Sequence, residues 1–452
     1  MKRVHFVAIG GQGMSGIATI LLNKGIEVSG SDIKPSDVTR RLNDMGARVF
    51  IGHDSANIIN PDVVVVSSAI SEDNPEVVEA RKRGIPVIHR MDMLLKAIDG
   101  KQIIGIAGAH GKTTTSAMIA WILEQAGKDP TYLIGGDLGH NGNARAGNGP
   151  LAVVETDESD GSFLKCHPEV SVVTNIDNDH LDYWGSLESL QGAFYSYLAA
   201  TKRGGTKIVC NDDPLLREWA VANPDAISYG VHSDAIWQAM DIRREGWTTK
   251  CRVFKQGRYV GSLDLKMPGM YNLQNALGAI AASVCVGVDP ENACQNLSTF
   301  PGVKRRLQRI GQFGKVLLLD DFAHHPKEIA AVLDTIRGSM PSARVIAVFQ
   351  PHRYSRTKLL HAEFGRAFSK ADVVVVTGIY SGPGEKLDPE VNPGFISESI
   401  EKAGHRSVFK VDDIESAATL AAGLCEGDTV LITLGAGDIW KAHDVLTKLL
   451  AT

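Results

Sequence analysis

The chain has 452 residues, enough for about three domains at the usual ~100–200 residues each. Hydrophobic residues make up 44% and charged residues 22%, which is typical of globular proteins and excludes a disordered chain. The net charge is -5 and the 47 Lys and Arg residues are scattered, so no surface for nucleic acid or an anionic membrane is expected.

Glycine is the compositional outlier, with 46 residues and no Gly-X-Y period, which predicts turns and backbone-lined ligand loops. None of the six cysteines forms a CxxC pair, so we expect neither a metal clip nor a disulfide framework, and a reducing cytoplasm fits best. Glycines interrupt the apolar stretch 4–23, so no export signal is expected. No other uncharged run is long enough for a membrane span.

The first hundred residues alternate short apolar runs with amphipathic stretches. The pattern predicts strands at 4–9, 26–30 and 63–66 and helices at 14–24 and 37–45. This rhythm is typical of a parallel sheet with crossover helices, and the polar break 99–101 marks a boundary. A Rossmann-like domain is therefore expected over residues 1–100.

A GxGxxG loop follows the first strand, from Gly11 to Gly16. A strand, this loop, a helix and the downstream Asp32 form the pattern that places a diphosphate on the helix N-terminus and a ribose hydroxyl on the acid. Taken alone, the loop predicts NAD. Any nucleoside linked through a diphosphate satisfies the same physics, including a UDP-sugar, so both interpretations stay open.

A second α/β unit begins at Ile103, where the strand 103–107 leads into Gly108-Ala109-His110-Gly111-Lys112-Thr113-Thr114 and an amphipathic helix. Backbone amides of such a loop converge on phosphate oxygens, Lys112 reaches the outer phosphates, and the Thr113 hydroxyl can bind Mg²⁺. The loop is shorter than GxxxxGK[ST], and an ordinary strand-to-helix turn is the alternative. We expect a P-loop-type nucleotide triphosphate site in a central domain, residues 101–302.

Polar residues follow two further strands of this central domain. The apolar run 151–154 ends in a group of carboxylates, Glu155, Asp157, Glu158 and Asp160. Because the carboxyl ends of parallel strands carry the site, Glu155 or Asp157 is expected to bind the metal, with a solvated acidic loop as the alternative. His180 follows the next strand, and on this pattern alone it is more often structural than a ligand.

The pattern changes between residues 235 and 267 to alternating strands with turns, which predicts a small antiparallel sheet. A helix is expected at 272–286, and Pro301 and Gly302 are expected to form a hinge. Beyond the hinge, helices alternate with strands at 316–320, 345–349, 373–377 and 429–434. This alternation predicts a second Rossmann-like domain over residues 303–452.

Two polar clusters follow strands of this last domain, DDFAHHP at 320–326 and QPHRYSR at 350–356. Both lie at strand carboxyl ends, so we expect them to face one crevice, although either alone is open to being a surface loop. Acid, imidazole and guanidinium groups together suit an amino-acid-sized zwitterion, with Arg353 or Arg356 holding a carboxylate.

With these motifs in place, the chain resembles the Mur ligases of peptidoglycan synthesis over essentially its full length. The matching segments are HFVAIGGQGMSGIA, GAHGKTTT, ETDESDGSFL, TNIDNDHLDYWGS, MYNLQNAL, DDFAHHPKEI, FQPHRYSRT and TLGAGDIW. The resemblance implies an N-terminal UDP-binding domain, a central ATPase domain with a mainly parallel sheet, and a Rossmann-like C-terminal domain that brings the amino acid. It is strongest to the branch that uses ATP and Mg²⁺ to join L-alanine to the lactyl carboxylate of UDP-N-acetylmuramate through an acyl phosphate.

The resemblance also implies roles for individual residues. ATP is expected to bind Gly108, Ala109, His110, Gly111, Lys112, Thr113, Thr114, Asn272, Asn275, Arg306 and Asp321. The metal ligands implied are Thr113, Glu155 and His180, which replaces the structural interpretation of His180. The catalytic residues implied are Lys112, Glu155, His180, Arg306 and His324. Substrates are expected at Gly11, Gly13, Ser15, Asp32 and Ser68 (uridine diphosphate), Asn143 and Arg145 (muramyl group), and His324, His352, Arg353 and Arg356 (L-alanine).

The chain departs from the family pattern at Phe322, where Tyr is common, and in the glycine-rich loop 139–149. Phe322 also resembles the sister ligase that attaches a recycled murein tripeptide to the same nucleotide, although PHRYSRT, DESDGSF and IDNDHLD match the alanine-adding branch better. An NAD-dependent oxidoreductase and a non-catalytic nucleotide-gated protein are the alternatives from other classes. We expect a cytoplasmic enzyme that is a monomer or homodimer.

Overall fold

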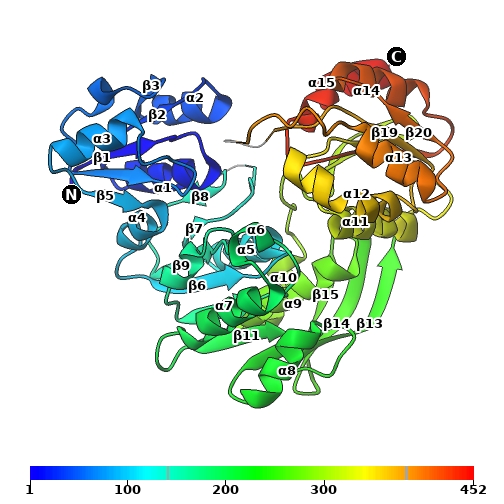
Figure 1. Ribbon diagram of the computed structural model, residues 1–452. Helices are drawn as coiled ribbons and strands as arrows, with labels where there is room; N and C mark the ends of the chain where they lie inside the picture. The colour runs from blue at the N-terminus through cyan, green and yellow to red at the C-terminus, as the bar shows by residue number, and fades with distance from the viewer. Residues whose placement is uncertain (140–141, 382–384, 452) are drawn as a thin grey trace. The chain divides into compact units, whose positions relative to one another are not determined.

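The structure, a computed structural model, describes residues 1–139, 142–381 and 385–451. It divides into two compact units. The first comprises Met1–Arg243, Lys250–Leu265 and Tyr271–Pro301, and the second Arg244–Thr249, Lys266–Met270 and Gly302–Thr452. Figure 1 shows the helices and strands of each unit in chain order. We describe each unit by itself.

A parallel sheet of five strands forms the beginning of the first unit, in the order β3-β2-β1-β4-β5. Its strands are β1 (Arg3–Val7), β2 (Glu27–Asp32), β3 (Arg48–Ile51), β4 (Val63–Val66) and β5 (Val87–His89). Its helices are α1 (Gln12–Asn23), α2 (Asp37–Asp44), α3 (Pro75–Lys82) and α4 (Arg90–Ala97). The predicted Rossmann-like arrangement is confirmed, and the strand order reverses between β1 and β4, where such sheets bind ligands.

A sheet of ten strands forms the rest of the first unit, in the order β15-β14-β13-β12-β11-β10-β6-β9-β7-β8. Its strands are β6 (Gln102–Ala107), β7 (Thr131–Leu133), β8 (Ala144–Arg145), β9 (Leu151–Glu155), β10 (Val170–Val173), β11 (Thr206–Cys210), β12 (Ile227–Gly230), β13 (Trp237–Glu245), β14 (Thr248–Lys255) and β15 (Arg258–Leu265). The accompanying helices are α5 (Lys112–Gln125), α6 (Leu181–Trp184), α7 (Leu187–Ala199), α8 (Pro214–Ala222), α9 (Met270–Cys285) and α10 (Pro290–Leu297). The strands from β7 and β9 through β6, β10 and β11 to β13 pair in parallel.

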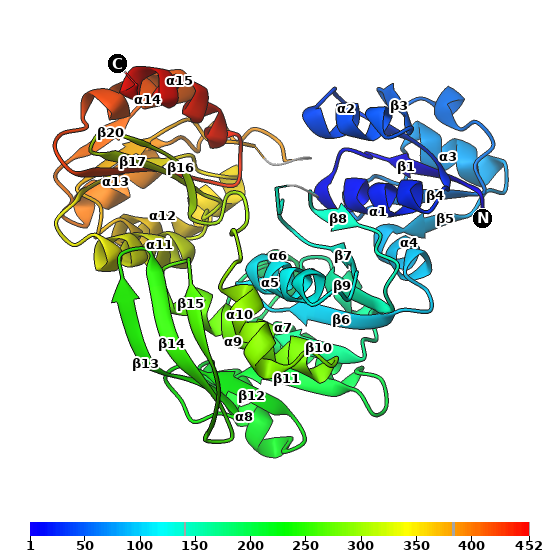
Figure 2. The same cartoon turned by 180° about the vertical axis from the view of Figure 1, so that it is seen from behind.

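The antiparallel strands expected between 235 and 267 extend this sheet and do not form a separate one. Tyr229 of β12 pairs in parallel with Trp237 of β13, and β14 and β15 follow as successive neighbours. Figure 2 shows β13, β14 and β15 side by side. The connections between them are short turns, which only antiparallel hairpins allow.

The second unit has a sheet of six strands in the order β16-β17-β21-β18-β19-β20. Its strands are β16 (Gln308–Phe313), β17 (Val316–Asp321), β18 (Arg344–Phe349), β19 (Val373–Val376), β20 (Val408–Lys410) and β21 (Thr429–Leu434), all parallel except β16. Its helices are α11 (Pro326–Ser339), α12 (Tyr354–Ala367), α13 (Gly394–Lys402), α14 (Ile414–Gly423) and α15 (Ala442–Leu450). The predicted second Rossmann-like fold is confirmed.

Alternating side chains of β17 divide the apolar core of this unit into two layers. Leu317 and Leu319 pack in the cluster that includes residues of α11, α12 and α13. Leu318 packs in the cluster that includes residues of α14 and α15. Because successive side chains of a strand point to opposite faces, helices cover both faces of the sheet.

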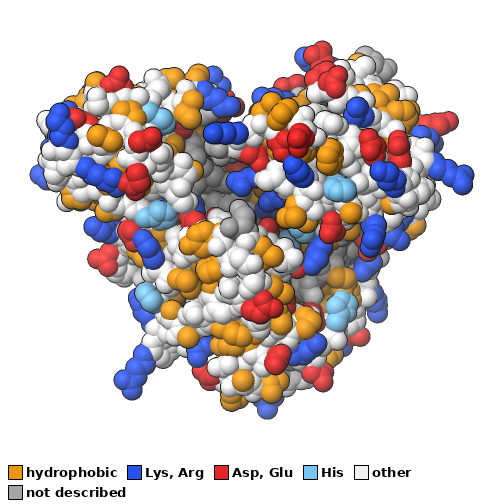
Figure 3. Space-filling model, viewed as in Figure 1, with side chains coloured by type: hydrophobic (Ala, Val, Ile, Leu, Met, Phe, Trp, Pro, Cys, Tyr) orange, Lys and Arg blue, Asp and Glu red, His pale blue; other side chains and the backbone are white. Residues whose placement is uncertain are grey.

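No helix within the described ranges is long and apolar enough to cross a membrane. Lys and Arg side chains are interspersed with Asp and Glu over the face seen in Figure 3.

Candidate active site

The loop between β6 and α5 requires glycine at both of its glycine positions. Gly108 and Gly111 have φ angles of +133° and +84°, in the region that side chains rarely adopt. A Cβ at Gly108 would collide with the Thr174 hydroxyl, and one at Gly111 would collide with the Asn275 amide. Gly111 caps α5 without a side-chain hydrogen bond, and the first turn carries no acid. The first amides of α5 therefore form a site suited to phosphate.

Lys112 extends over this loop and forms an ion pair with Glu158. Its Nζ lies 2.8 Å from Glu158 Oε1 and donates to the carbonyls of Gly108 at 2.5 Å and Ala109 at 3.2 Å. Burial disfavours the charged amine, but the carboxylates of Glu158 and Asp157 outweigh this effect and raise the pKa of Lys112. The loop therefore carries a fixed positive charge where the outer phosphates of a nucleotide would lie.

Thr113 and Glu155, both predicted to bind the metal, lie together. Glu155, the last residue of β9, accepts a hydrogen bond from Thr113 Oγ1 at 3.0 Å. Its other oxygen accepts from the Gly135 N–H at 2.5 Å and from Ser116 Oγ at 3.3 Å. These bonds hold the carboxylate beside the first turn of α5.

His180 lies beside Glu158, whereas the resemblance implied it as a metal ligand together with Thr113 and Glu155. It has a φ of +54°, and its Nε2 lies 4.0 Å from Glu158 Oε1 and 3.7 Å from Asp179 Oδ2. In the described part of the chain, His180 and Glu155 form neither a hydrogen bond nor an ion pair with each other. The predicted metal ligands therefore lie in two groups, Thr113 with Glu155 and His180 with Glu158.

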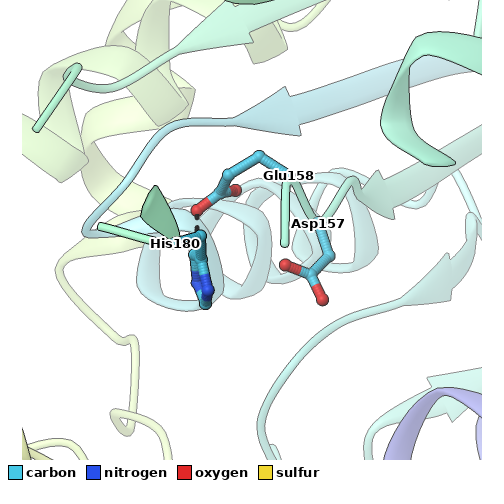
Figure 4. Close-up of side chains that lie close together, drawn as sticks. All are labelled: Asp157, Glu158 and His180. Atoms are coloured by element: carbon cyan, nitrogen blue, oxygen red, sulfur yellow. Dashed lines mark ion pairs between the residues drawn. The ribbon is translucent and has the colours of Figure 1, made fainter. Parts of the chain in front are cut away.

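Sequence reasoning did not select Glu158, which the structure places at the centre of the site. Ligand atoms of Asp157, Glu158 and His180 lie within 4.8 Å of one another. Figure 4 shows the ion pair between Glu158 and His180, with the Asp157 carboxylate beside it. The four clustered carboxylates were visible in the sequence, but no spacing indicates which one turns back toward Lys112.

The Glu158 carboxylate fits a site for a cation. Its side chain is 1% exposed, and its Oε2 has no hydrogen-bond partner among the described residues. Burial raises the pKa of Glu158, and the charge of Asp157 adds to the effect, although Lys112 opposes it. Carboxylate oxygens are the ligands that Mg²⁺ prefers, and an orphaned buried oxygen is costly unless a cation approaches it.

The other residues predicted for ATP in the first unit surround the same loop. Asn272 and Asn275 lie in the first part of α9 and are buried, and Asn275 abuts Gly111. The His110 N–H donates to Asn175 Oδ1 at 2.8 Å, and its Nε2 lies 3.2 Å from Asp177 Oδ2. The loop is therefore braced by β10 and α9.

The residues predicted for uridine diphosphate lie at the carboxyl edge of the first sheet. Asp32 Oδ2 accepts from the Gly10 N–H at 2.9 Å, and Gly11 caps α1 without a side-chain hydrogen bond. Ser15 is buried and donates to the Gln12 carbonyl within α1. Ser68 Oγ donates to Asp160 Oδ2 at 2.9 Å, so it contacts the acidic loop.

The two residues proposed from the glycine-rich loop are separated by the structure. Asn143 Nδ2 donates to the Gln12 carbonyl at 3.1 Å, which places it at the start of α1. Arg145 instead pairs with Glu124 at 3.1 Å and with Asp129. Two further residues of this loop, 140 and 141, lie outside the described residues.

The two polar clusters of the second unit meet, as predicted. The rings of His324 and His352 lie 5.7 Å apart, and Arg356 Nη1 donates to His352 Nδ1 at 3.2 Å. Burial, reinforced by the charges of His324 and Arg356, lowers the pKa of His352 to about 3. Its imidazole is therefore neutral at physiological pH.

Two residues of this site were missed because they lie far along the chain from the clusters. Tyr380 stacks on the His352 ring at 5.7 Å, and its carbonyl accepts from the Arg353 N–H at 2.9 Å. Glu385 accepts from the N–H groups of Tyr354 at 3.0 Å and Ser355 at 3.1 Å. Arg353 is held at a φ of +69°, an unusual angle for a residue with a side chain.

Phe322 forms an aromatic platform for two arginines. The guanidinium carbons of Arg305 and Arg306 lie 5.1 and 5.2 Å from its ring centre. Arg305 is also bound to Asp320 at 3.2 Å and to a backbone carbonyl at 3.0 Å, which indicates a structural role. A cation–π contact uses the ring face, so it does not require the hydroxyl of the more common Tyr.

Asp321 organises the backbone around these arginines. Its oxygens accept from the N–H groups of Leu307 at 2.5 Å and Ala323 at 2.7 Å. Burial raises its pKa to about 6, although the charge of Arg306 opposes the shift.

Comparison with known proteins finds three consecutive matches along the chain. Residues 3–102 match the Mur ligase family, catalytic domain, residues 106–283 the Mur ligase middle domain, and residues 305–437 the Mur ligase, glutamate ligase domain.

Individual relatives cover between about two thirds and nearly all of the chain. A curated UDP-N-acetylmuramate--L-alanine ligase from Pelotomaculum thermopropionicum is 43% identical over 450 residues, covering 99% of this chain and 97% of the relative. The crystal structure of UDP-N-acetylmuramate-alanine ligase MurC from Thermotoga maritima has a TM-score of 0.84 at 31% identity, covering 99% of this chain and 98% of that chain. A UDP-N-acetylmuramate:L-alanyl-gamma-D-glutamyl-meso-diaminopimelate ligase from Neisseria meningitides has a TM-score of 0.61 at 30% identity, covering 68% of this chain and 100% of that chain. From this identity and coverage, together with the geometry of the phosphate loop, we conclude that the chain belongs to the Mur ligase family.

Proposed function

We propose that the chain is an ATP-dependent ligase that joins L-alanine to the lactyl carboxylate of UDP-N-acetylmuramate. The observation that carries this proposal is the placement of Lys112, Thr113 and Glu155 around one glycine loop at a helix N-terminus. An NAD-dependent oxidoreductase would leave this arrangement without a role. The relative from Pelotomaculum, similar over the whole chain, carries the name of the alanine ligase.

The residues of the first unit suit the activation of a carboxylate. A carboxylate does not react with an amine, so its oxygen first attacks the γ-phosphate of ATP, and ADP leaves. Lys112 neutralises charge on the transferring phosphoryl group, and the first amides of α5 orient the other phosphates. Thr113 and Glu155 on one side, and His180 and Glu158 on the other, would hold Mg²⁺, which would further neutralise the phosphate oxygens.

The residues of the second unit suit the amino acid. Arg353 or Arg356 binds the alanine carboxylate, and the neutral amine attacks the acyl phosphate, forming the amide bond and releasing phosphate. His324 accepts the proton that the amine loses. His352 is too weak a base for this role, because its pKa is about 3, and it serves as a neutral hydrogen-bonding group.

In this proposal each of the three predicted domains binds one substrate. Residues 1–100 bind the UDP-sugar, residues 101–302 bind ATP, and residues 303–452 bind the amino acid. The UDP-sugar site consists of Gly11, Gly13, Ser15, Asp32 and Ser68. Asn272, Asn275, Arg306 and Asp321 belong to the ATP site in this proposal, and Asn143 and Arg145 to the sugar site. The enzyme acts in the cytoplasm as a monomer or homodimer.

An ADP-release assay with UDP-N-acetylmuramate tests this function. We expect ADP formation that depends on both the nucleotide and the amino acid, with L-alanine preferred over glycine, L-serine and L-alanyl-γ-D-glutamyl-diaminopimelate. Preference for the tripeptide would instead establish the second candidate, which Phe322 favours. Lys112→Ala should abolish ADP release and leave UDP-sugar binding intact, and loss of both would contradict the division into sites.

A further inference from the structure

Arg90 occupies a position between two sites, although no sequence motif singled it out. It is the first residue of α4 and follows β5 at the carboxyl edge of the parallel sheet, where such folds bind nucleotides. Its Nη2 donates to Asp160 Oδ2 at 3.1 Å and to Asp157 Oδ2 at 3.5 Å. One end of the guanidinium is therefore bound to the acidic loop beside the ATP site.

The other end of the guanidinium lies against the first turn of α1. A Cβ built on Gly13, the second residue of α1, would lie 2.9 Å from Arg90 Nη1. The first turn of α1 contains no acid, and its cap, Gly11, makes no side-chain hydrogen bond. The amides of this turn and Nη1 together present positive charge at the GxGxxG loop, where a diphosphate would lie.

Asp160 holds the inner end of Arg90 in place. It also accepts from Ser68 Oγ at 2.9 Å and lies 3.6 Å from His89 Nε2. Burial opposes ionisation of Asp160, but hydrogen bonds from His89 and Ser162 and the charge of Arg90 hold its pKa well below the usual range. Nη2 is therefore bound to a permanent carboxylate, while Nη1 has no hydrogen-bond partner among the described residues.

The acidic loop connects Arg90 to the ATP site. Asp157, one of its two partners, is followed directly by Glu158, which pairs with Lys112 at 2.8 Å. The consecutive residues Asp157 and Glu158 therefore link Arg90, which lies against the first turn of α1, to Lys112.

Building on the proposed function, we propose that Arg90 is a substrate-binding residue whose Nη1 binds the diphosphate of the sugar nucleotide while Nη2 stays on Asp160. The bound nucleotide then fixes the acidic loop that carries Asp157 and Glu158. Arginine suits this role because its planar fork donates from two nitrogens at once, which lysine cannot do.

Calorimetric titration of the full chain with UDP, uridine and ADP tests this proposal. We expect Arg90→Ala to weaken UDP binding roughly 10- to 100-fold, the range for a lost charged hydrogen bond, and to leave uridine and ADP binding within about twofold of the unaltered chain. Arg90→Lys keeps the charge but loses the fork, and it should recover part of the UDP affinity. Arg81→Ala is the matched control, because Arg81 is an exposed residue of the same sheet's α3 that pairs with Glu72.

The coupling to the acidic loop has its own test. Asp160→Asn keeps the size of the side chain but removes the charge that holds Nη2, so kcat for ADP release should fall while the affinity for UDP stays within about fivefold. UDP affinity unchanged in Arg90→Ala, or weakened equally for uridine, would overturn the proposal. Failure of the unaltered chain to bind UDP at all would refute the proposed function, and the inference with it.

Discussion

Replacing Lys112 by Met breaks an ion pair that the structure buries almost completely. The Lys112 side chain is 13% exposed and that of Glu158 1%, and their charged atoms lie 2.8 Å apart. Removing one partner of a buried pair costs about 3–5 kcal/mol because the other charge is left uncompensated. We therefore expect Lys112→Met to lose both ADP formation and stability of the central sheet.

The stability loss should depend on pH in a direction that the structure predicts. Burial already raises the pKa of Glu158 above its ordinary value of 4.5, and loss of Lys112 raises it further. A carboxyl group whose pKa is higher in the folded than in the unfolded chain costs stability as pH rises above 4.5 and through the folded value. The variant should therefore be less destabilised near about pH 5.5 than near about pH 8, because the lower pH favours the protonated form of Glu158.

Urea unfolding at the two pH values, with hydrogen exchange of peptides from 102–125 and 151–165, measures this loss where it arises. The double variant Lys112→Met/Glu158→Gln removes both charges and should recover at least ~2 kcal/mol relative to Lys112→Met, without recovering activity. The reasoning is refuted if Lys112→Met is as stable as the unaltered chain at both pH values, or if the second substitution restores nothing.

Three further predictions concern other parts of the site. Gly111→Ala, which adds strain and a collision with Asn275, should abolish ADP binding, whereas Gly127→Ala, at a φ of +69° with open space around it, should leave binding intact. Phe322→Leu should lower kcat/KM for ADP release about 3- to 30-fold through loss of the cation–π contact with Arg306, while Phe322→Tyr, which keeps the ring, should stay within about threefold. NMR titration should find the His352 ring neutral down to about pH 4. Arg356→Gln should raise the pKa of His352, because a neighbouring cation is removed. A His352 pKa near 6.5 in the unaltered chain would contradict the site geometry.

Much of the fold and part of the site could be predicted because strand ends carry the polar residues. The carboxyl ends of parallel strands share one edge of a sheet, so the loop at 108–114 and the acids after β9 had to lie close together. The hydrogen bond between Thr113 and Glu155 is one consequence. The contact between His324 and His352 follows in the same way from the pairing of β17 and β18 with β21.

The remaining features depend on contacts that no local pattern encodes. Alternation predicted the strands of 235–267, but not that the edge of β12 would pair with β13 and continue the sheet. Glu158 is one of four nearby carboxylates, and only the turn of the backbone after β9 directs it to Lys112. Tyr380 comes after β19, and its place on His352 results from the stacking of two strand-end loops.

The fate of the carboxylate oxygen tests the proposed chemistry most directly. UDP-N-acetylmuramate labelled with ¹⁸O in its lactyl carboxylate would be incubated with ATP, Mg²⁺ and L-alanine, and the released phosphate would be analysed by mass spectrometry. Attack of the carboxylate on the γ-phosphate predicts that each released phosphate carries one oxygen from the carboxylate. Unlabelled phosphate, formed together with the amide product, would contradict the account.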